Sequence, residues 1–323
     1  MNKILITGGA GFIGFHLAQR LKEQFKIDLI DDFSRGNKDA ELNSLIDDIN
    51  VKIHKINLLK DHKKIDKLSK NYSYIFHLAA IVGVKNVMGS PYEVLTKNIN
   101  LLQNTINIAK KQKKLKRFVF ASSSEVYYGT LENHGLTFPT NEKTKISLLN
   151  LSNKRGTYML SKIYGEALCR QSGLPFTIIR PHNFYGPRMG LSHVIPELCK
   201  KIYFSKNKKI KVFSPQHRRN FCYIDDGVKL ILSLIFKKQS LRKTFNVGSN
   251  TKDITIEKLA KNLIRTSKKK LKNKKEKNLL DSPIRRFPDV SKALKIAQIK
   301  YNYPLTSGLS KTYEWYKKNL QKK

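Results

Sequence analysis

The sequence predicts an α/β protein with a doubly wound parallel sheet, followed by a smaller C-terminal α/β domain. In the first half of the 323-residue chain, short β-branched runs alternate with helix-length amphipathic segments. Spaced glycines follow the first apolar run directly. After Arg180 the alternation loosens into shorter elements. Regular strand–helix alternation is typical of parallel sheets covered by helices on both faces. We therefore expect two domains, at 1–175 and 176–323, with some segments interleaved.

The elements of the first half follow from this alternation. We expect strands at Lys3–Thr7, Lys26–Asp31, Val51–Asn57, Tyr74–Leu78, Arg117–Ser122 and Phe176–Arg180. Helical periodicity between them predicts helices at Gly11–Gln24, Ile65–Lys70, Pro91–Gln112 and Gly156–Gln171.

The second half is predicted to hold shorter elements. We expect helices at Val194–Tyr203, Asp226–Phe236, Ile256–Ser267 and Leu309–Leu320, and strands at Ile210–Phe213, Asn220–Ile224 and Thr244–Val247. The lysine-rich stretch 268–277 is expected to be a solvated loop or a fraying helix.

Composition narrows the class of protein. No apolar run reaches the roughly 18 residues of a membrane span. The three cysteines lack the spacing of a zinc site or a disulfide framework, so we expect no metal and a cytoplasmic location. The formal net charge of +39 permits nucleic-acid binding. Because the lysines spread along the whole chain, a solvated basic surface is the preferred interpretation, and nucleic acid is an unlikely partner.

The glycine-rich turn predicts a dinucleotide site of the Rossmann type. Such glycines let the backbone approach a pyrophosphate, and the following helix offers its N–H groups to the phosphates. The residues are Gly8, Gly11, Phe12, Ile13 and Gly14. Asp31 ends the second strand, where a carboxylate binds the ribose of NAD and repels the 2′-phosphate of NADP. NAD is therefore the predicted cofactor; the alternative is a turn that binds nothing.

A candidate catalytic group comes from two further segments. Tyr158 and Lys162 are four residues apart in a predicted helix, so they share one face. An ammonium near a phenol lowers the pKa of the phenol toward working pH. The serines at 122–124, at the end of a strand, can hydrogen-bond the same reacting oxygen. Together these groups can remove a proton from a hydroxyl while a nicotinamide accepts the hydride.

These motifs, in this order, resemble the extended short-chain dehydrogenase/reductase superfamily, specifically its NAD-dependent nucleotide-sugar epimerases and dehydratases. The resemblance covers nearly the whole chain. It implies that Ser123 is the catalytic serine and that Tyr158 and Lys162 are both catalytic and cofactor-binding. It also implies further cofactor contacts at Leu78, Ala79, Ala80 and Asn57. Members commonly carry aspartate where Asn57 stands, and their gap between serine and tyrosine is usually shorter.

The resemblance extends to the second half and implies a nucleoside-diphosphate sugar, most simply a UDP-sugar, as substrate. Asn183 occupies the position that contacts the phosphates in the family. Arg219 and Arg286 match two arginines that bind the diphosphate. Lys85 belongs to the loop that lines the sugar pocket.

The expected reaction is 4-epimerisation, through a transient 4-keto sugar to which the hydride returns. Glu125 leaves two alternatives open, because a glutamate there resembles 4,6-dehydratases and UDP-glucuronate decarboxylases. A carboxylate that only orders the loop is also possible. Remote alternatives are a non-catalytic NAD-binding regulator and a nucleic-acid binder. The resemblance further implies a homodimer built from the helices at 91–112 and 156–171. The apolar stripe of the first consists of Leu95, Ile99, Leu102, Ile106 and Ala109.

Overall fold

The computed structural model of the chain describes residues 1–36, 38–206, 208–278 and 282–321. It divides into two compact units, each made of several stretches of chain. The first contains Met1–Gly135, Thr144–Arg180 and Ile231–Phe245, and the second contains Leu136–Lys143, Pro181–Leu230 and the chain from Asn246 onward. The first unit thus continues past residue 175 and takes in a segment that the sequence assigned to the second domain.

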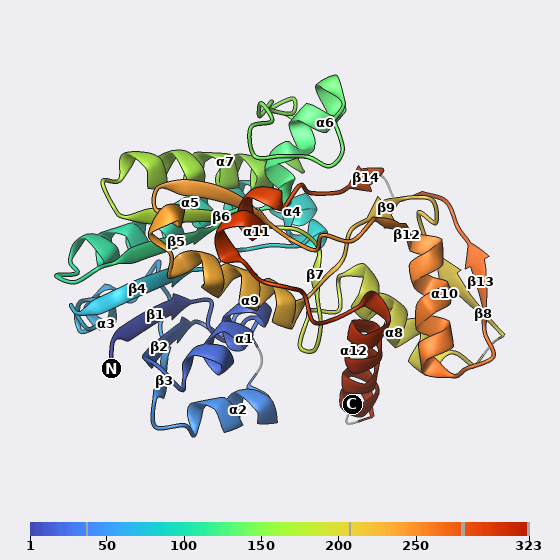
Figure 1. Ribbon diagram of the computed structural model, residues 1–323, viewed down its shortest axis with the longest axis horizontal. Coiled ribbons are helices and arrows are strands. Elements are labelled where there is room, and N and C mark those ends of the chain that lie inside the picture. The colour runs from blue at the N-terminus through green and yellow to red at the C-terminus, as the bar shows by residue number, and fades with distance from the viewer. Residues whose placement is uncertain (37, 207, 279–281, 322–323) are drawn as a thin grey trace. The chain divides into compact units, whose positions relative to one another are not determined.

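The first unit is built on a seven-stranded sheet (Figure 1). The strands are β1 (Lys3–Thr7), β2 (Lys26–Asp31), β3 (Val51–Lys55), β4 (Tyr72–His77), β5 (Arg117–Ala121), β6 (Phe176–Pro181) and β11 (Lys243–Val247). Their order in the sheet is β11-β6-β5-β4-β1-β2-β3, and the pairs from β6 to β3 are parallel. The strand order reverses between β1 and β4, and open α/β sheets bind ligands at such a reversal, beyond the carboxyl ends of the strands.

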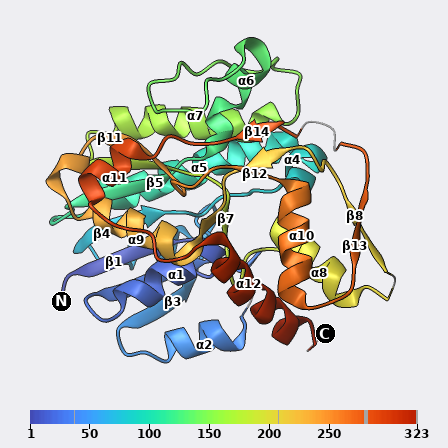
Figure 2. The same ribbon diagram turned by 45° about the vertical axis from the view of Figure 1, so that its right-hand side comes forward.

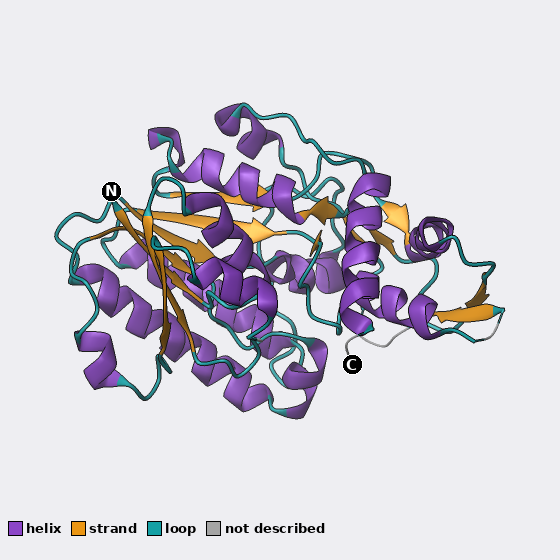
Figure 3. Cartoon of the chain, turned by 90° about the horizontal axis from the view of Figure 1, so that it is seen from below, coloured by secondary structure: helices purple, strands orange, loops and turns teal. Residues whose placement is uncertain are grey.

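Helices cover both faces of this sheet (Figure 3). The helices of this unit include α1 (Phe12–Leu21), α2 (Ala40–Ile46), α3 (His62–Asp66), α4 (Val84–Gly89), α5 (Pro91–Lys110), α6 (Tyr128–His134) and α7 (Gly156–Gln171), with short 3-10 turns η1 (Ser124–Tyr127) and η2 (Lys238–Ser240). α5 and α7 lie side by side on one face (Figure 1). Leu102 and Ile106 of α5 pack with Leu5, Phe118 and Ile178 of the strands, and these contacts form the core.

The second unit consists of helices and very short strands. Its helices are α8 (Val194–Phe204), α10 (Ile256–Ser267), α11 (Ser291–Ala297) and α12 (Leu305–Leu320), and α9 (Ile224–Ile235) connects it to the first unit along the chain. Its strands are β7 (Phe184–Tyr185), β8 (Lys209–Val212), β9 (Arg218–Arg219), β10 (Cys222–Tyr223), β12 (Ile254–Thr255), β13 (Lys272–Lys275) and β14 (Arg285–Arg286). α8, α10 and α12 pack against one another (Figure 2).

Several local predictions differ from the structure. The lysine-rich stretch forms β13, which pairs in parallel with β8. Its sequence has low β propensity, so the pairing partner decides its conformation. The strand expected at 220–224 is shorter in the structure, where β10 covers Cys222–Tyr223 and α9 begins at Ile224, and β11 joins the large sheet. The short helices α2, α4, α6 and α11 have too few residues to produce a clear helical periodicity.

The long segment between Ser123 and Tyr158 belongs partly to each unit. Residues 136–143 belong to the second unit. There the Thr140 N–H donates to the Phe287 carbonyl (2.8 Å), and the Asp289 N–H donates to the Thr140 carbonyl (2.8 Å). This part of the long segment therefore makes backbone hydrogen bonds with the residues that follow β14. Within the described parts of the chain, no helix is long and apolar enough to cross a bilayer.

Candidate active site

Lys162 is the buried cation of the candidate site. It lies one turn after Tyr158 on α7. Its Nζ lies 5.7 Å from the centre of the Tyr158 ring. The same Nζ donates a 2.7 Å hydrogen bond to the Ala121 carbonyl at the end of β5. Burial lowers the pKa of Lys162 to about 8. The structure therefore brings the Lys162 ammonium close to the Tyr158 phenol, as their four-residue spacing in a helix predicts.

Ser123 lies directly after β5 and caps the turn that carries Glu125. Its Oγ accepts a 3.1 Å hydrogen bond from the Glu125 N–H. A hydroxyl that accepts from the backbone keeps its own hydrogen for another acceptor. Ser123 is partly buried at the carboxyl end of a central strand, where ligands of open α/β sheets bind. The position suits a serine that donates to a reacting oxygen.

Arg155 is a residue of this site that our sequence reasoning missed. Its Nη2 lies 3.7 Å from the Glu125 Oε1, and the two side chains are only 10% and 19% exposed. Its guanidinium also lies 4.9 Å from the centre of the Tyr128 ring. Arg155 is the N-cap of α7. A cation at the positive end of a helix is electrostatically unfavourable, so Glu125 compensates a local cost. The available sequence signal was an arginine three positions before Tyr158.

The glycine turn has the geometry of a phosphate-binding loop. Gly8 has a φ of +70°, and a Cβ there would lie 2.9 Å from the Ala79 N. A Cβ on Gly14 would lie 2.9 Å from the Gly9 Cα. Gly11 caps α1 without a side-chain hydrogen bond, and Phe12 and Ile13 form its first turn. The first N–H groups of a helix have no partner within the helix. This loop therefore fits the pyrophosphate of a dinucleotide, which would lie at the N-terminus of α1.

Asp31 is held by the glycine turn and by its own loop. Its Oδ2 accepts from the Ala10 N–H (3.0 Å), and its Oδ1 accepts from the Phe33 N–H (2.9 Å). Burial raises its pKa, although both hydrogen bonds lower it. Asn57 lies just after the end of β3, the strand that pairs with β2. Its Nδ2 donates to the Asp32 Oδ2 (3.2 Å). The two predicted adenosine contacts thus lie after adjacent strands of the sheet.

The residues after β4 line the strand-order reversal. The Leu78 N–H donates to the Thr7 carbonyl (3.2 Å), and the Ala79 N–H donates to the Thr7 Oγ1 (3.3 Å). Ala80 follows them and is partly buried. These contacts hold the segment beside the glycine turn. Lys85 lies exposed on α4, and no contact between it and the catalytic residues is found in the described part of the first unit.

The second unit brings the three other predicted substrate residues together. β9 and β14 are parallel, and Arg219 is the register partner of Arg286. The Asn183 Nδ2 donates to the Asn220 carbonyl (3.0 Å), and the Asn220 N–H donates to the Arg286 carbonyl (3.1 Å). The Nη1 and Nη2 of Arg219 donate to backbone carbonyls, at 2.6 Å in the case of Pro283. These contacts with the neighbouring backbone hold the Arg219 guanidinium in place.

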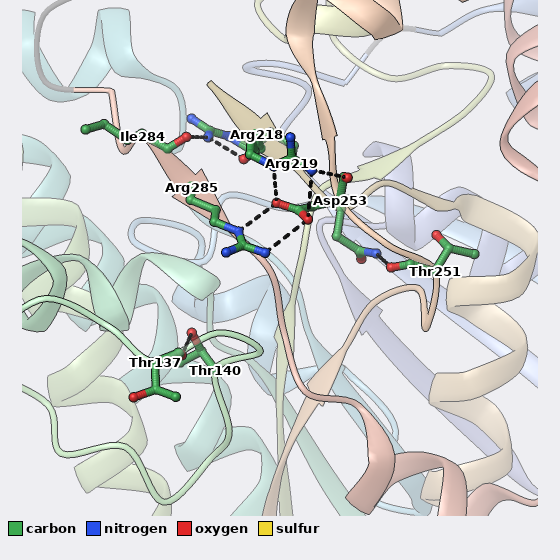
Figure 4. Close-up of polar contacts among 9 residues, drawn as sticks. Thr137, Thr140, Arg218, Arg219, Thr251, Asp253, Ile284 and Arg285 are labelled. Atoms are coloured by element: carbon green, nitrogen blue, oxygen red, sulfur yellow. Dashed lines mark hydrogen bonds and ion pairs between the residues drawn. The ribbon is translucent and has the colours of Figure 1, made fainter. Parts of the chain in front are cut away.

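Asp253 organises the opposite face of this ladder, and our sequence reasoning missed it (Figure 4). Its carboxylate contacts the Arg218 Nε (3.0 Å) and the Arg285 Nε (2.7 Å). Burial opposes its ionisation, but the hydrogen bonds from both arginines lower its pKa. Asp253 thus fixes one arginine of each paired strand. Guanidinium groups match phosphate geometry, so the strand pair that carries Arg219 and Arg286 suits a diphosphate.

Comparisons with known proteins agree with this geometry. The model of the NAD dependent epimerase/dehydratase family matches residues 4–248. UDP-N-acetyl-alpha-D-glucosaminuronate decarboxylase of Bacillus cytotoxicus is 31% identical, over 98% of this chain and 98% of its own length. dTDP-D-glucose 4,6-dehydratase of Dictyostelium discoideum is 31% identical over 83% of this chain, and the match covers 62% of the relative.

A solved structure gives the same result for the fold. UDP-glucuronic acid 4-epimerase of Bacillus cereus, in complex with UDP-glucuronic acid and NAD, superposes with a TM-score of 0.85. It is 27% identical, and the match covers 98% of this chain and 99% of that one. The family match and the full-length relative, together with the glycine turn and the Tyr158–Lys162 pair, lead to one conclusion: the chain belongs to the NAD-dependent epimerase/dehydratase family of nucleotide-sugar enzymes.

Proposed function

We propose that the protein decarboxylates a UDP-linked hexuronic acid after oxidising its C4 hydroxyl. The observation that carries this proposal is the position of Arg155. Its guanidinium lies 3.7 Å from Glu125, at the start of the helix that holds Tyr158 and Lys162. A neutral hexose has no anionic group for Arg155 to bind as a second cation beside Lys162. A C5 carboxylate does, because a guanidinium matches carboxylate geometry.

The residues divide the reaction among them. NAD, held at the glycine turn and by Asp31, would supply the acceptor for the C4 hydride. Tyr158 removes the proton of the C4 hydroxyl, assisted by the Lys162 ammonium, while Ser123 donates a hydrogen bond to the same oxygen. The carboxylate is then β to a ketone, so the C5–carboxylate bond breaks and its electron pair moves into the enolate. Protonation at C5, hydride return to C4 and proton return from Tyr158 to the C4 oxygen complete the cycle. One proton is consumed and one carbon dioxide is released.

Two of the proteins compared above support a hexuronate substrate, but they differ in the reaction. The full-length Bacillus cytotoxicus relative is named for decarboxylation of such a sugar. The Bacillus cereus structure, by contrast, is a 4-epimerase that holds UDP-glucuronic acid. Epimerisation is therefore the second candidate, and it is the reaction that our sequence analysis favoured. The same two proteins are named for UDP-sugars, and this supports UDP as the nucleotide of the substrate.

Product analysis tests the proposed reaction. The protein with NAD should release carbon dioxide from UDP-glucuronate or UDP-N-acetylglucosaminuronate and form a UDP-pentose, as followed by NMR. Arg155→Gln should raise the KM for the uronate by about tenfold or more, the loss expected for a charge-assisted contact. Lys154→Gln, at the exposed neighbouring position, is the matched control. A 4-epimer that keeps its carboxylate would transfer the assignment to the epimerases.

We also propose that the cofactor is NAD in preference to NADP. Asp31 would face the adenosine ribose, and a 2′-phosphate beside a carboxylate costs several kcal/mol. The Kd for NADP should exceed that for NAD by more than about tenfold, and Asp31→Ser should reduce this ratio. Fluorescence titration with both dinucleotides measures it. Equal affinities in the unaltered protein would remove the assigned role of Asp31.

A homodimer through α5 and α7 completes the proposal. Leu102, Ile106 and Ala109 of the expected stripe are buried in the core of the first unit, so they do not serve an interface. The outward candidates are instead Tyr92, which is 73% exposed on α5, and Tyr164, which is 44% exposed on α7. Light scattering at micromolar concentration should give twice the chain mass, and Tyr164→Lys should give a monomer. A monomer in the unaltered protein would contradict the proposal.

A further inference from the structure

A buried ion pair lies behind the candidate catalytic residues and takes no part in the reaction proposed above. Arg180, on β6, contacts Glu166 of α7 through two parallel bonds, Nε to Oε1 and Nη2 to Oε2, each 2.7 Å long. The side chains are 4% and 6% exposed. This is a complete fork-to-carboxylate pair, the strongest geometry that such groups adopt.

The pair also holds both ends of the segment that carries Ser123. The Ser122 Oγ donates to the Glu166 Oε1 (2.6 Å), directly before the catalytic serine. The Arg180 Nη1 donates to the Tyr127 hydroxyl (2.6 Å), at the end of η1. Ser123 and Glu125 lie between these two attachments. The pair therefore restrains the segment from both sides.

The same pair restrains the catalytic helix. Tyr158, Lys162 and Glu166 follow one another at intervals of four residues, so they lie on one face of α7. Lys162 is attached to the end of β5 through the Ala121 carbonyl. Glu166 adds a second attachment, to the next residue, Ser122. Helix and strand end are thus joined at two successive positions, and this double attachment sets where the Tyr158 hydroxyl lies relative to Ser123.

Stability alone is a poor explanation for this arrangement. A buried ion pair costs several kcal/mol of desolvation per ion, and well-packed apolar replacements are often equally stable or more stable. Geometry is a better explanation, since a misplacement of about 1 Å between reacting groups lowers turnover by about 10²-fold. We propose that Glu166 and Arg180 are positioning residues, which set the relative placement of Ser123, Glu125 and Tyr158 through Ser122, Tyr127 and α7.

The test separates positioning from stability, and it relies on the proposed function only in needing NAD-dependent turnover. Glu166→Gln and Arg180→Met each leave one buried charge unpaired, so both should lower Tm and kcat. The double variant leaves none, so its Tm should recover most of the loss. Its kcat should stay about 10²-fold below that of the unaltered protein, with KM and the Kd for NAD within about threefold. Recovery of kcat together with Tm would overturn the proposal.

Two further variants keep the test decisive if the double variant does not fold. Tyr127→Phe removes the hydrogen bond from Arg180 and changes no charge, so it should lower kcat by about tenfold while lowering Tm less than either single charge variant does. An unchanged kcat would contradict the proposal. Asp28→Asn is the matched control, because Asp28 is a buried carboxylate that pairs with Lys3 and accepts a hydrogen bond from Tyr72, near the amino ends of the strands. It should lower Tm without changing kcat. The kcat ratios are measurable whether the product is a pentose or a 4-epimer, so failure of the decarboxylase assignment leaves this test intact.

Discussion

Replacing Tyr158 by phenylalanine is expected to lower kcat by about 10²–10⁴-fold while NAD still binds. The phenol is the group that we propose removes the C4 proton, and the Lys162 Nζ lies 5.7 Å from its ring centre. Phenylalanine keeps the ring and removes only the proton acceptor. Stopped-flow measurement of NADH formation with the UDP-uronate, together with a dinucleotide titration, separates loss of chemistry from loss of binding.

Tyr164→Phe is the matched control for this substitution. Tyr164 lies on the same helix, but it is 44% exposed and belongs to the outer surface. Phenylalanine keeps the ring that would contact the partner copy, so Tyr164→Phe should leave kcat within about twofold and should still give a dimer in light scattering. Near-native turnover by Tyr158→Phe would show that another group removes the proton, and the reaction class assigned to this chain would then be wrong.

The second large effect is expected at Glu125. Glu125→Gln keeps the size of the side chain and removes its charge. Arg155, whose Nη2 lies 3.7 Å from the Glu125 Oε1, then loses its ionic partner. If the protein is a decarboxylase, we expect the Glu125 carboxyl group to take part in proton transfer at C5 after carbon dioxide leaves. Release of the pentose should then fall by about 10²–10⁴-fold. The proposed C4 oxidation uses Ser123, Tyr158 and Lys162 instead, so NADH and a 4-keto sugar should accumulate. Mass spectrometry of quenched reactions detects the ketone.

The outcome at Glu125 distinguishes the candidate reactions. If the enzyme is a 4-epimerase, hydride transfer and return do not need this carboxylate, and turnover should fall by less than about tenfold. A dehydratase would lose activity on a neutral 6-hydroxy sugar instead. Glu132→Gln, at an exposed position on α6, is the control for a general effect of removing a negative charge from this strongly basic chain.

Much of the first unit was predictable because its signals are local. The run from Lys3 to Gly14 contains a strand, a turn and a helix start within twelve residues, and the structure has all three in sequence. β1, β2 and α7 begin and end at the predicted residues. The four-residue spacing of Tyr158 and Lys162 needs only a helix to bring them together. Periodicity and turn chemistry act over a few residues, so a single sequence carries them.

The sequence by itself therefore determined the glycine turn, the acidic end of β2 and the Tyr158–Lys162 pair. Tertiary structure decided the rest, since the partners are distant in the chain. Arg155 meets Glu125, and Asp253 joins Arg218 to Arg285, only after folding. The conformation of β13 likewise depends on β8, against the weak β propensity of a lysine-rich segment. Such contacts join segments that are far apart in the chain, so the pattern within one segment does not specify them.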